Sequence, residues 1–274
     1  MTKPSLDQIR RLLDDAEPAT VTAIFQYLRT KQVIHRLETE WGIRAEFVLE
    51  AISCSQDITQ RGVRGIIAEL AFSEYILKPL SARFREVRIV GDQPYDALIS
   101  DELGVIRIQT KNQRLILDPA SKRRVPLHPN AARTAKHPAV EGWFVAETQK
   151  TRSGKAKSAD KTASDATSQS TRPYRVGEFD VLSVCLHPST NDWTQFMFSP
   201  ATTLLRRTSN DDQLEVLQPV PRTACFAWTA SLVECISWVR DPASCPATFD
   251  SVLLSERPRL KAPVKALRRT KRLK

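Results

Sequence analysis

PYDALISDELGVIRIQTKNQ, residues 94–113, is the most informative segment of this sequence. Two apolar runs flank Asp-Glu-Leu-Gly at 101–104, which is good turn material, so the stretch predicts a β-hairpin. In the second run apolar and polar residues alternate, and this period of 2 places the side chains of Gln109 and Lys111 on one face of the strand. The hairpin brings Asp96, on the first strand, across from both of them. An acid, an amide oxygen and a lysine at one spot can hold a hydrated Mg²⁺ beside a phosphodiester.

A long helix is predicted before the hairpin, over residues 57–80. Its apolar stripe contains a carboxylate, Glu69, which must be paired, protonated or bound to a metal in such surroundings. Gly62 and Gly65 precede Glu69 and, because glycine lowers helix stability, indicate a close approach of another group to this face. Alternatively, Glu69 lies at the edge of the stripe and reaches solvent or an arginine.

The composition indicates a folded protein, since 41% of the 274 residues are hydrophobic and five are tryptophan. No apolar run approaches the roughly 20 residues that a membrane helix needs, and the polar N-terminus has no signal-peptide core. The five cysteines form no Cys-x-x-Cys pair, and most stand in apolar surroundings, which suits reduced, buried thiols. The eight glycines form no phosphate-binding loop. We therefore expect a cytoplasmic protein with no membrane partner and no nucleotide cofactor.

The formal net charge of +10 favours a polyanionic partner, because each cation placed on a phosphate releases condensed counterions. The surplus is concentrated at residues 257–274, which contain no acidic residue. This basic tail either clamps nucleic acid or is a solvated, disordered terminus. Five further residues are candidates for contact with DNA: Lys122, Arg123, Arg124, Tyr174 and Arg175. A solvated face or ordinary packing explains these five as well.

Three regions follow from the pattern along the chain. Residues 1–56 predict short helices that either read DNA or only pack. Residues 57–256 predict the core. We expect an α/β fold with a mixed sheet, of the α+β kind. Its strands are expected at 84–90, 97–99, 105–111, 143–147, 179–186, 194–198 and 214–220, and a last helix at 227–239. Residues 150–171 are rich in Ser, Thr, Ala and Lys and predict a mobile loop.

The order of these elements resembles the PD-(D/E)xK nuclease superfamily, the fold of many type II restriction endonucleases and of Holliday-junction resolvases. The residues that carry the resemblance are Glu69 in the helix, Pro94-Tyr95-Asp96, and Gln109-Thr110-Lys111. The match covers roughly residues 57–112. It departs from the pattern at Tyr95, an extra residue before the aspartate, and at Gln109, which replaces an acid. Members of the superfamily with Gln at this position are known and active. The resemblance implies a restriction-endonuclease-like core with a helical N-terminal region.

The resemblance also implies a Mg²⁺-dependent endonuclease that hydrolyses double-stranded DNA, with Mn²⁺ able to replace Mg²⁺. Glu69, Asp96, Gln109 and the backbone carbonyl of Thr110 would hold the ion, and Lys111 would orient the attacking water. A type II restriction endonuclease is the first expectation, and cutting both strands of a palindrome suggests a homodimer. The alternatives are a homing or junction-resolving endonuclease with the same site, and a non-catalytic basic DNA-binding protein whose hairpin is structural.

Overall fold

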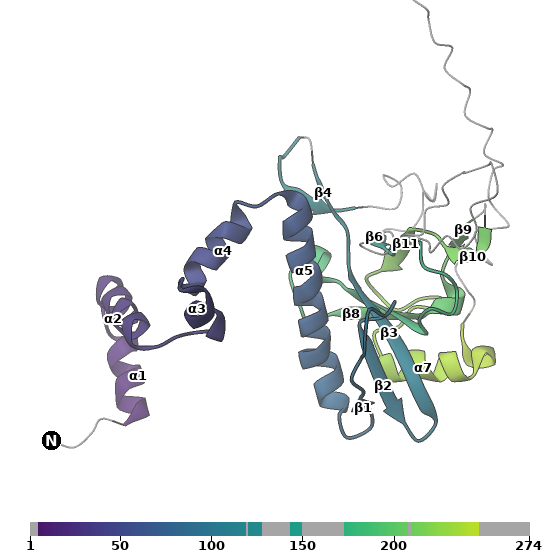
Figure 1. The fold of residues 1–274 in the computed structure, drawn as a ribbon, viewed down its shortest axis with the longest axis horizontal. Helices are drawn as coiled ribbons and strands as arrows, with labels where there is room; N and C mark the ends of the chain where they lie inside the picture. Colours follow the sequence, from purple (N-terminus) through teal and green to yellow (C-terminus); the bar gives the residue numbers. More distant parts are fainter. Residues whose placement is uncertain (1–4, 119, 128–142, 150–172, 208–209, 247–274) are drawn as a thin grey trace, which may run out of the picture. The chain divides into compact units, whose positions relative to one another are not determined.

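A computed structural model describes residues 5–118, 120–127, 143–149, 173–207 and 210–246 (Figure 1). The chain divides into two compact units, residues 1–63 and 64–274. The boundary between the two units falls after residue 63, inside a helix, whereas the sequence pattern predicts it after residue 56. The predicted loop over 150–171 and the predicted basic tail over 257–274 lie outside the described residues.

The N-terminal unit contains short helices, as the sequence predicts. They are α1 (Leu6–Asp14), α2 (Pro18–Lys31), α3 (Arg36–Trp41) and α4 (Ala45–Ser53). Ser5 begins α1 with a capping box that Gln8 completes, so two backbone N–H groups of the first turn are paired. Gly42 ends α3 with a φ of 67°, in the left-handed region that favours glycine.

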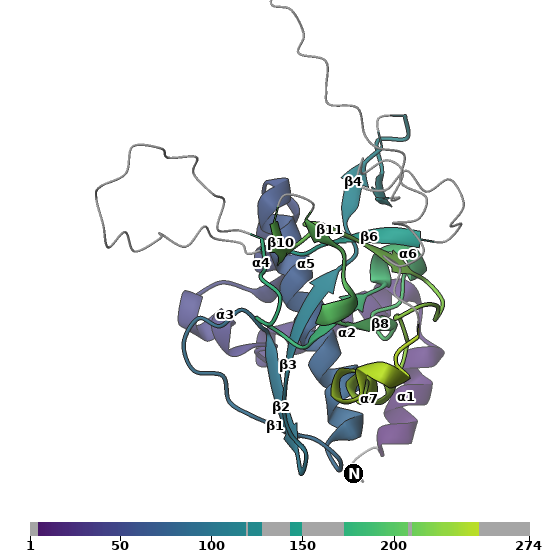
Figure 2. The ribbon, with the colours of Figure 1, turned by 90° about the vertical axis from the view of Figure 1, so that its right-hand side faces the viewer.

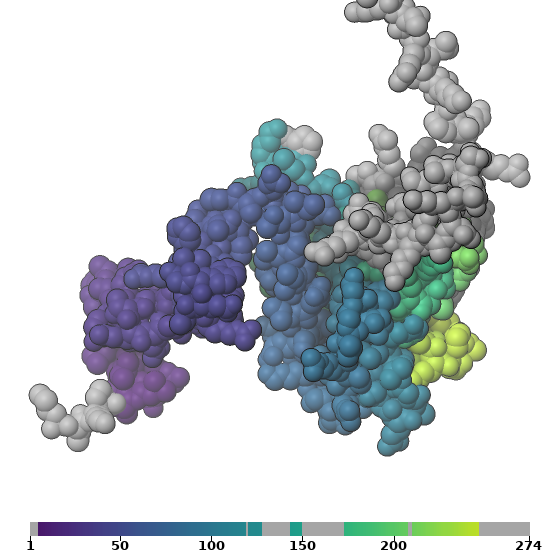
Figure 3. Space-filling view, in the orientation of Figure 1, coloured from purple at the N-terminus to yellow at the C-terminus, as the bar shows by residue number. Residues whose placement is uncertain are grey.

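None of these four helices contains a buried residue. Large apolar side chains remain exposed along them, including Leu12, Phe25, Trp41 and Phe47. Figure 3 shows the surface of these helices in purple and dark blue. Burial of apolar surface is the dominant favourable contribution to most folded units. Local helix contacts and charged groups must therefore contribute a larger share of the order here.

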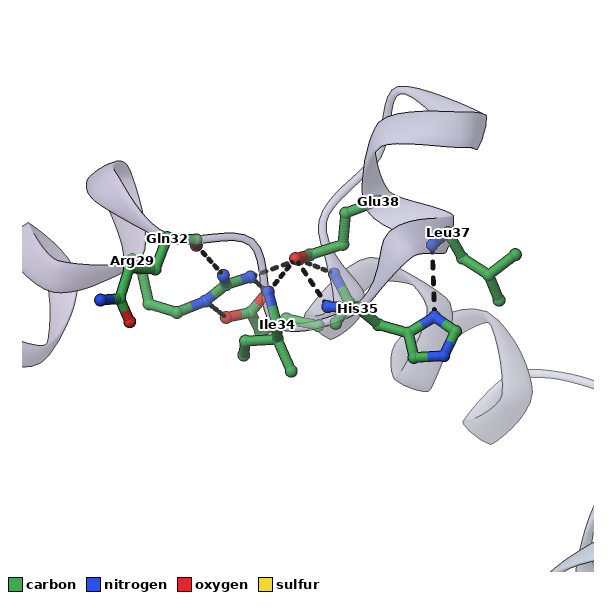
Figure 4. Close-up of polar contacts among 8 residues, drawn as sticks. Arg29, Gln32, Ile34, His35, Leu37 and Glu38 are labelled. Atoms are coloured by element: carbon green, nitrogen blue, oxygen red, sulfur yellow. Dashed lines mark hydrogen bonds and ion pairs between the residues drawn. The ribbon is translucent and has the colours of Figure 1, made fainter.

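Arg29, on α2, links α3 and α4 (Figure 4). Its Nε donates to Glu46 at 2.7 Å, and its Nη2 donates to Glu38 at 2.5 Å. Glu38 also accepts from the backbone N–H groups of Ile34, at 2.6 Å, and Ala45, at 2.7 Å. The side chains of Arg29 and Glu38 are only 6% and 9% exposed. Arg29, Glu38 and Glu46 are called the Arg29 cluster below.

The second unit is built on a mixed five-stranded sheet (Figure 2). Its strands, in spatial order, are β1 (Arg85–Glu86), β2 (Ala97–Asp101), β3 (Gly104–Asn112), β7 (Val181–Cys185) and β8 (Phe196–Pro200). Strands β3 and β7 are parallel, and the other neighbours are antiparallel. The predicted α+β class is confirmed at this level.

The hairpin of β2 and β3 forms as the sequence predicts. Ala97 pairs with Ile108 and Asp101 with Gly104, so the turn lies at 102–103. The second predicted hairpin, β7 and β8, also forms, with a short helix, α6 (His187–Thr190), in its connection. The strand predicted over 84–90 is much shorter than expected, because only β1 pairs with β2.

The predicted helix over 57–80 is helical throughout, but its geometry changes along its length. Helix α5 (Asp57–Phe72) passes into a π-helical segment (Ser73–Leu77) and then a 3-10 turn (Lys78–Leu80). Pro79 lies in that last turn and has no N–H to donate, which limits how far the regular α-helical bonding can continue.

The face that α5 buries is narrower than its apolar stripe. Ala68 and Phe72 join a hydrophobic cluster with side chains of β2, β3, β7 and β8, whereas Ile66 and Leu70 are exposed. No other part of the described protein approaches Gly62 or Gly65 closely, because a Cβ added at either glycine would meet nothing within 4 Å.

Helix α7 (Leu232–Arg240) contributes to the same cluster as α5 through Leu232, Cys235 and Ile236. It begins after Ser231, whose side chain accepts from the N–H of Glu234, and so starts later than the predicted residue 227. A second hydrophobic cluster contains Leu182, Val184 and Met197, which alternate along β7 and β8 with the members of the first cluster. The sheet therefore carries apolar side chains on both faces.

Smaller pairs of strands extend the second unit. They are β6 (Trp143–Glu147) with β11 (Leu217–Pro221), β4 (Leu115–Leu117) with β5 (Arg124–Pro126), and β9 (Arg206–Arg207) with β10 (Asn210–Leu214). The single edge strand expected over 214–220 is thus two strands, β10 and β11. Two further 3-10 turns lie at Ala201–Thr203 and Pro242–Ser244.

Within the described residues, no helix has both the length and the apolar character needed to cross a membrane. All five cysteines are free thiols, as expected from the sequence. Cys185 and Cys235 are buried, but Cys225 and Cys245 are only partly buried and Cys54 is exposed. The expectation of buried thiols is therefore wrong for Cys54.

Candidate functional site

Asp96 lies directly before β2, and its carboxylate is held against β3. The backbone N–H of Asp96 donates to the carbonyl of Ile108 at 2.9 Å, which continues the hairpin ladder. Its Oδ2 accepts from the backbone N–H of Thr110 at 2.8 Å and from Nε2 of Gln109. The structure thus places the acid of the first strand beside the amide of the second, which is the arrangement that the hairpin predicts.

Gln109 is 1% exposed, and both ends of its carboxamide have partners. Its Nε2 donates to Asp96 and, at 3.3 Å, to the backbone carbonyl of Thr110. Its Oε1 accepts from the hydroxyl of Tyr174 at 3.1 Å. In this conformation the amide nitrogen, and not the oxygen, faces Asp96.

Lys111 is half-buried at the end of β3, with its Nζ 5.7 Å from the centre of the Tyr174 ring. Burial lowers the pKa of Lys111, and the negative charges of Asp96, Glu69 and Glu147 oppose this shift. Glu147, on β6, was not a candidate from the sequence, because nothing local to WFVAE points to β3. The ammonium group therefore lies within the field of three carboxylates.

Glu69 faces this group from α5. Its side chain reaches water, yet the protein around it displaces enough solvent to raise its pKa to about 7. The charge of Asp96 raises this pKa further, and that of Lys111 lowers it. The charges of two other candidate residues therefore act on the Glu69 carboxylate.

The pKa of Asp96 is also raised, mainly by loss of water around the carboxylate. The charge of Lys111 and the hydrogen bonds from Thr110 and Gln109 oppose that shift. The pKa shifts of Glu69, Asp96 and Lys111 thus all favour the neutral form of the side chain. Shifts caused by desolvation beside specific charges are enriched at functional sites.

The oxygen atoms present fit a hard divalent cation once one group turns. Nε2 of Gln109 lies between Oδ2 of Asp96 and the carbonyl oxygen of Thr110, a position that a positively polarised group favours. Turning the carboxamide by half a turn would exchange Nε2 for Oε1. Carboxylate, amide and carbonyl oxygens are the ligands that Mg²⁺ accepts.

The acids alone do not form a metal cluster. Among the described residues, no group of three or more His, Cys, Asp or Glu side chains gathers in a way that could hold a metal ion. This result agrees with the side chains present, since Gln109 is neutral and the candidate site holds two carboxylates, Glu69 and Asp96. A cation here would depend on the neutral oxygens as well.

Arg107 fixes β3 against the segment that enters β7. Its Nε and Nη2 donate to the two carboxylate oxygens of Asp180 at 3.0 and 2.7 Å, and its Nη1 donates to the carbonyl of Gly177 at 2.7 Å. Such a bidentate pair sets both distance and orientation. The segment leading to Asp180 also carries Tyr174, so this pair helps to bring Tyr174 onto Gln109.

Tyr174 lies inside the protein rather than on a surface that could face DNA. It is 4% exposed, and its ring packs edge-on against Phe179 with 5.3 Å between ring centres. Burial raises the pKa of Tyr174, and the charge of Asp96 adds to this shift, so the hydroxyl keeps its proton. The expected contact of Tyr174 with DNA is replaced in this structure by its contact with Gln109.

The other DNA-contact candidates are exposed. Lys122, Arg123 and Arg124 lie at the turn between β4 and β5, where Lys122 adopts a φ of 55° and the side chain of Asp118 accepts from the N–H of Ser121 at 2.9 Å. This β4–β5 turn follows the end of β3 in the chain. Arg175 is exposed too, next to the buried Tyr174.

Comparisons with known protein families, with curated proteins and with solved structures find no match for this chain. The functional assignment therefore depends on the site itself.

Proposed function

We propose that this protein is a Mg²⁺-dependent endodeoxyribonuclease that hydrolyses phosphodiester bonds of duplex DNA, with a core of the PD-(D/E)xK type. One observation carries the proposal. Asp96, the amide of Gln109 and the carbonyl of Thr110 meet at one point, with Glu69 and Lys111 coupled to them electrostatically. Each of these five positions corresponds to one position of the family motif, with Gln109 standing where the motif has an acid.

The order of the elements supports the same proposal. Glu69 comes from α5, which packs on the sheet, and the other groups come from the adjoining strands β2 and β3. An antiparallel hairpin followed by a parallel neighbour, β7, places these strands inside the sheet and not at its edge. A site on rigid, central elements keeps its geometry.

The residues divide the chemical work. Asp96 and Glu69 would supply negative charge to the cation, and Gln109 and Thr110 would supply neutral oxygens. Bound Mg²⁺ would lower the pKa of a water molecule and offset charge on the phosphate oxygens. Lys111 would place an ammonium beside the scissile phosphate, where partial exclusion of water strengthens its attraction for developing charge.

DNA as the substrate is supported by charge. The formal net charge is +10, and Lys122, Arg123 and Arg124 are exposed at the β4–β5 turn, which follows the candidate site in the chain. Cations at such positions bind phosphates without regard to sequence. A type II restriction endonuclease, acting as a homodimer on a palindrome, is the member of this class that we favour.

Incubation of plasmid DNA with the full-length protein and Mg²⁺ tests the proposal. We expect discrete fragments with Mg²⁺ or Mn²⁺, and intact plasmid with chelator. Asp96→Asn and Lys111→Ala should each reduce cleavage by about 100-fold or more, the typical effect of removing a group that stabilises transition-state charge. Asp92→Asn and Lys78→Ala, the same kinds of change at exposed positions, should cut normally.

Undiminished cleavage by Asp96→Asn or by Lys111→Ala would refute the site. Binding of DNA by the wild type without cleavage in any divalent metal would support a non-catalytic DNA-binding protein instead. Preferential cleavage of four-way junctions would support a junction-resolving enzyme with the same site.

A further inference from the structure

We propose that Tyr174 is a positioning residue whose hydroxyl lets the carboxamide of Gln109 present its oxygen to the metal. This inference rests on the proposed function and explains how a glutamine can serve where the family motif has an acid. A carboxylate has two equivalent oxygens, but a carboxamide binds a cation through one end only. A neighbouring group must therefore accept the other end.

The geometry around Tyr174 meets that requirement. Its hydroxyl lies 3.1 Å from Oε1 of Gln109, at the end of the amide away from Asp96. The ring is 4% exposed and packs edge-on against Phe179, so the hydroxyl is held in place by packing. Lys111 lies over the same ring, with its Nζ 5.7 Å from the centre. One buried aromatic side chain thus contacts both residues of the Gln-x-Lys element.

A hydroxyl group can pair with either end of an amide, because it both donates and accepts hydrogen bonds. In the conformation observed, Tyr174 donates to Oε1 of Gln109, and Nε2 donates to Asp96 and to the carbonyl of Thr110. With a cation between those two oxygens, the positively polarised Nε2 would be repelled and Oε1 attracted. The turned amide would then donate through Nε2 to the oxygen of the Tyr174 hydroxyl, so the amide nitrogen would keep an acceptor inside the protein.

Loss of the hydroxyl should therefore weaken metal binding more than it weakens the metal-free fold. Without it, the metal-free state leaves one buried amide oxygen without its partner. The metal-bound state would instead leave buried N–H groups without an acceptor, and unpaired buried N–H groups are tolerated less well than carbonyl oxygens. We expect Tyr174→Phe, which keeps the ring, to raise the Kd for Mn²⁺ about fivefold to tenfold.

Calorimetric titration of the full-length protein with Mn²⁺, without DNA, tests the inference. The Gln109→Glu variant serves as a second background. It should bind Mn²⁺ more tightly than the wild type, because it adds charge and has no amide to orient. In that background, adding Tyr174→Phe should change the Kd less than twofold. Tyr75→Phe removes the same hydroxyl at an exposed position and should leave the Kd unchanged.

Three results would overturn the inference. They are an unchanged Kd for Tyr174→Phe, an equal loss in the wild-type and Gln109→Glu backgrounds, and an equal loss for Tyr75→Phe. Failure of the wild type to bind Mn²⁺ would overturn the proposed function and this inference together, whereas binding with any of the three results overturns the inference alone.

The wild type also provides a readout that does not depend on whether Tyr174→Phe folds. The side-chain amide resonances of Gln109 should shift when diamagnetic Mg²⁺ binds, because the nitrogen exchanges Asp96 for Tyr174 as its neighbour. Mg²⁺ binding that leaves those resonances in place would contradict the proposal.

Discussion

Two charged clusters in this protein use the same ingredients, two carboxylates and one cation, with opposite results. In the Arg29 cluster, hydrogen bonds from Arg29 lower the pKa of both Glu38 and Glu46 to about 2. In the candidate site, loss of water raises the pKa of Glu69 to about 7, and it lowers the pKa of Lys111. The first arrangement stabilises its charges, and the second does not.

The difference lies in how the cation meets the acids. The planar guanidinium of Arg29 donates directly to both carboxylates, and Glu38 accepts from three backbone N–H groups as well. At the candidate site, Lys111 lies over an aromatic ring, and Asp96 is paired with neutral donors. Complete pairing is typical of a structural cluster. At the candidate site the charges of Asp96 and Lys111 are incompletely paired, so an added cation or phosphate can provide a further electrostatic interaction.

The largest expected effect follows directly from that contrast. A divalent cation that binds only the folded protein should stabilise it by about 2.7 kcal/mol at a concentration of 100 Kd. For a unit of about 200 residues, this corresponds to a rise in Tm of about 5–10 °C. Thermal unfolding of the full chain with and without Mn²⁺ measures the shift.

Variants assign the shift to one cluster or the other. Asp96→Asn should remove the response to Mn²⁺, because it removes charge from the candidate site. Glu46→Gln should keep the response in full, because the Arg29 cluster has no need of a further cation. A response that survives Asp96→Asn but is lost in Glu46→Gln would reverse our assignment of the two clusters.

The sequence predicts the frame of the candidate site well because that frame is local. Turn residues at 101–104 and a period of 2 fix the β2–β3 hairpin and bring Asp96 opposite Gln109. The helix that carries Glu69 follows from its apolar stripe. In each of these cases the interacting residues are close in sequence or lie on adjacent elements.

Contacts across long sequence separations could not be predicted in the same way. Tyr174 and Gln109 are 65 residues apart, and their contact depends on the parallel pairing of β3 with β7. No local pattern shows that pairing, so the sequence leaves contact with DNA and ordinary packing as alternatives for Tyr174. The orientation of the Gln109 amide depends on Tyr174, so it could not be predicted from the sequence either.

Apolar periodicity also predicts a helix more reliably than it predicts burial. Leu6, Ile9 and Leu12 form a stripe on α1, yet all three are exposed. On α5 the small residues Ala68 and Ala71 are buried together with Phe72, whereas Ile66 and Leu70 are exposed. What a helix face buries depends on the partner available, which a single stretch of sequence does not contain.

A smaller effect is expected from the pH dependence of the candidate site. The folded pKa of Glu69, about 7, lies above its ordinary value of 4.5. The folded protein therefore binds more protons between these values, and stability falls as the pH rises from 4.5 through 7. In chelator, Glu69→Gln should raise the stability at pH 8 by about 1 kcal/mol, after allowing for screening of an exposed carboxylate.

That gain corresponds to about 2–4 °C in Tm and should disappear at pH 4.5 and below. Thermal unfolding across this pH range measures it, with Glu74→Gln, at an exposed glutamate on the π-helical segment that follows α5, as the control. A gain of the same size at pH 4 and pH 8 would show that the charge of Glu69 is not its source.

The smallest effect is expected in the Arg29 cluster, with the opposite pH dependence. The folded pKa of Glu46, about 2, lies below its ordinary value, so its stabilising contribution is present above pH 4.5 and is lost as the pH falls toward 2. The side chain is 51% exposed and Glu38 retains its bond to Arg29, so Glu46→Gln should loosen α2 to α4 only slightly.

Amide hydrogen exchange of these helices measures the change locally, with Glu40→Gln on α3 as the control. We expect faster exchange than in the wild type at pH 7 and no difference near pH 2. A difference that grows as the pH falls would mean that Glu46 is not held by Arg29 as an ionised carboxylate, and the contrast between the two clusters would fail.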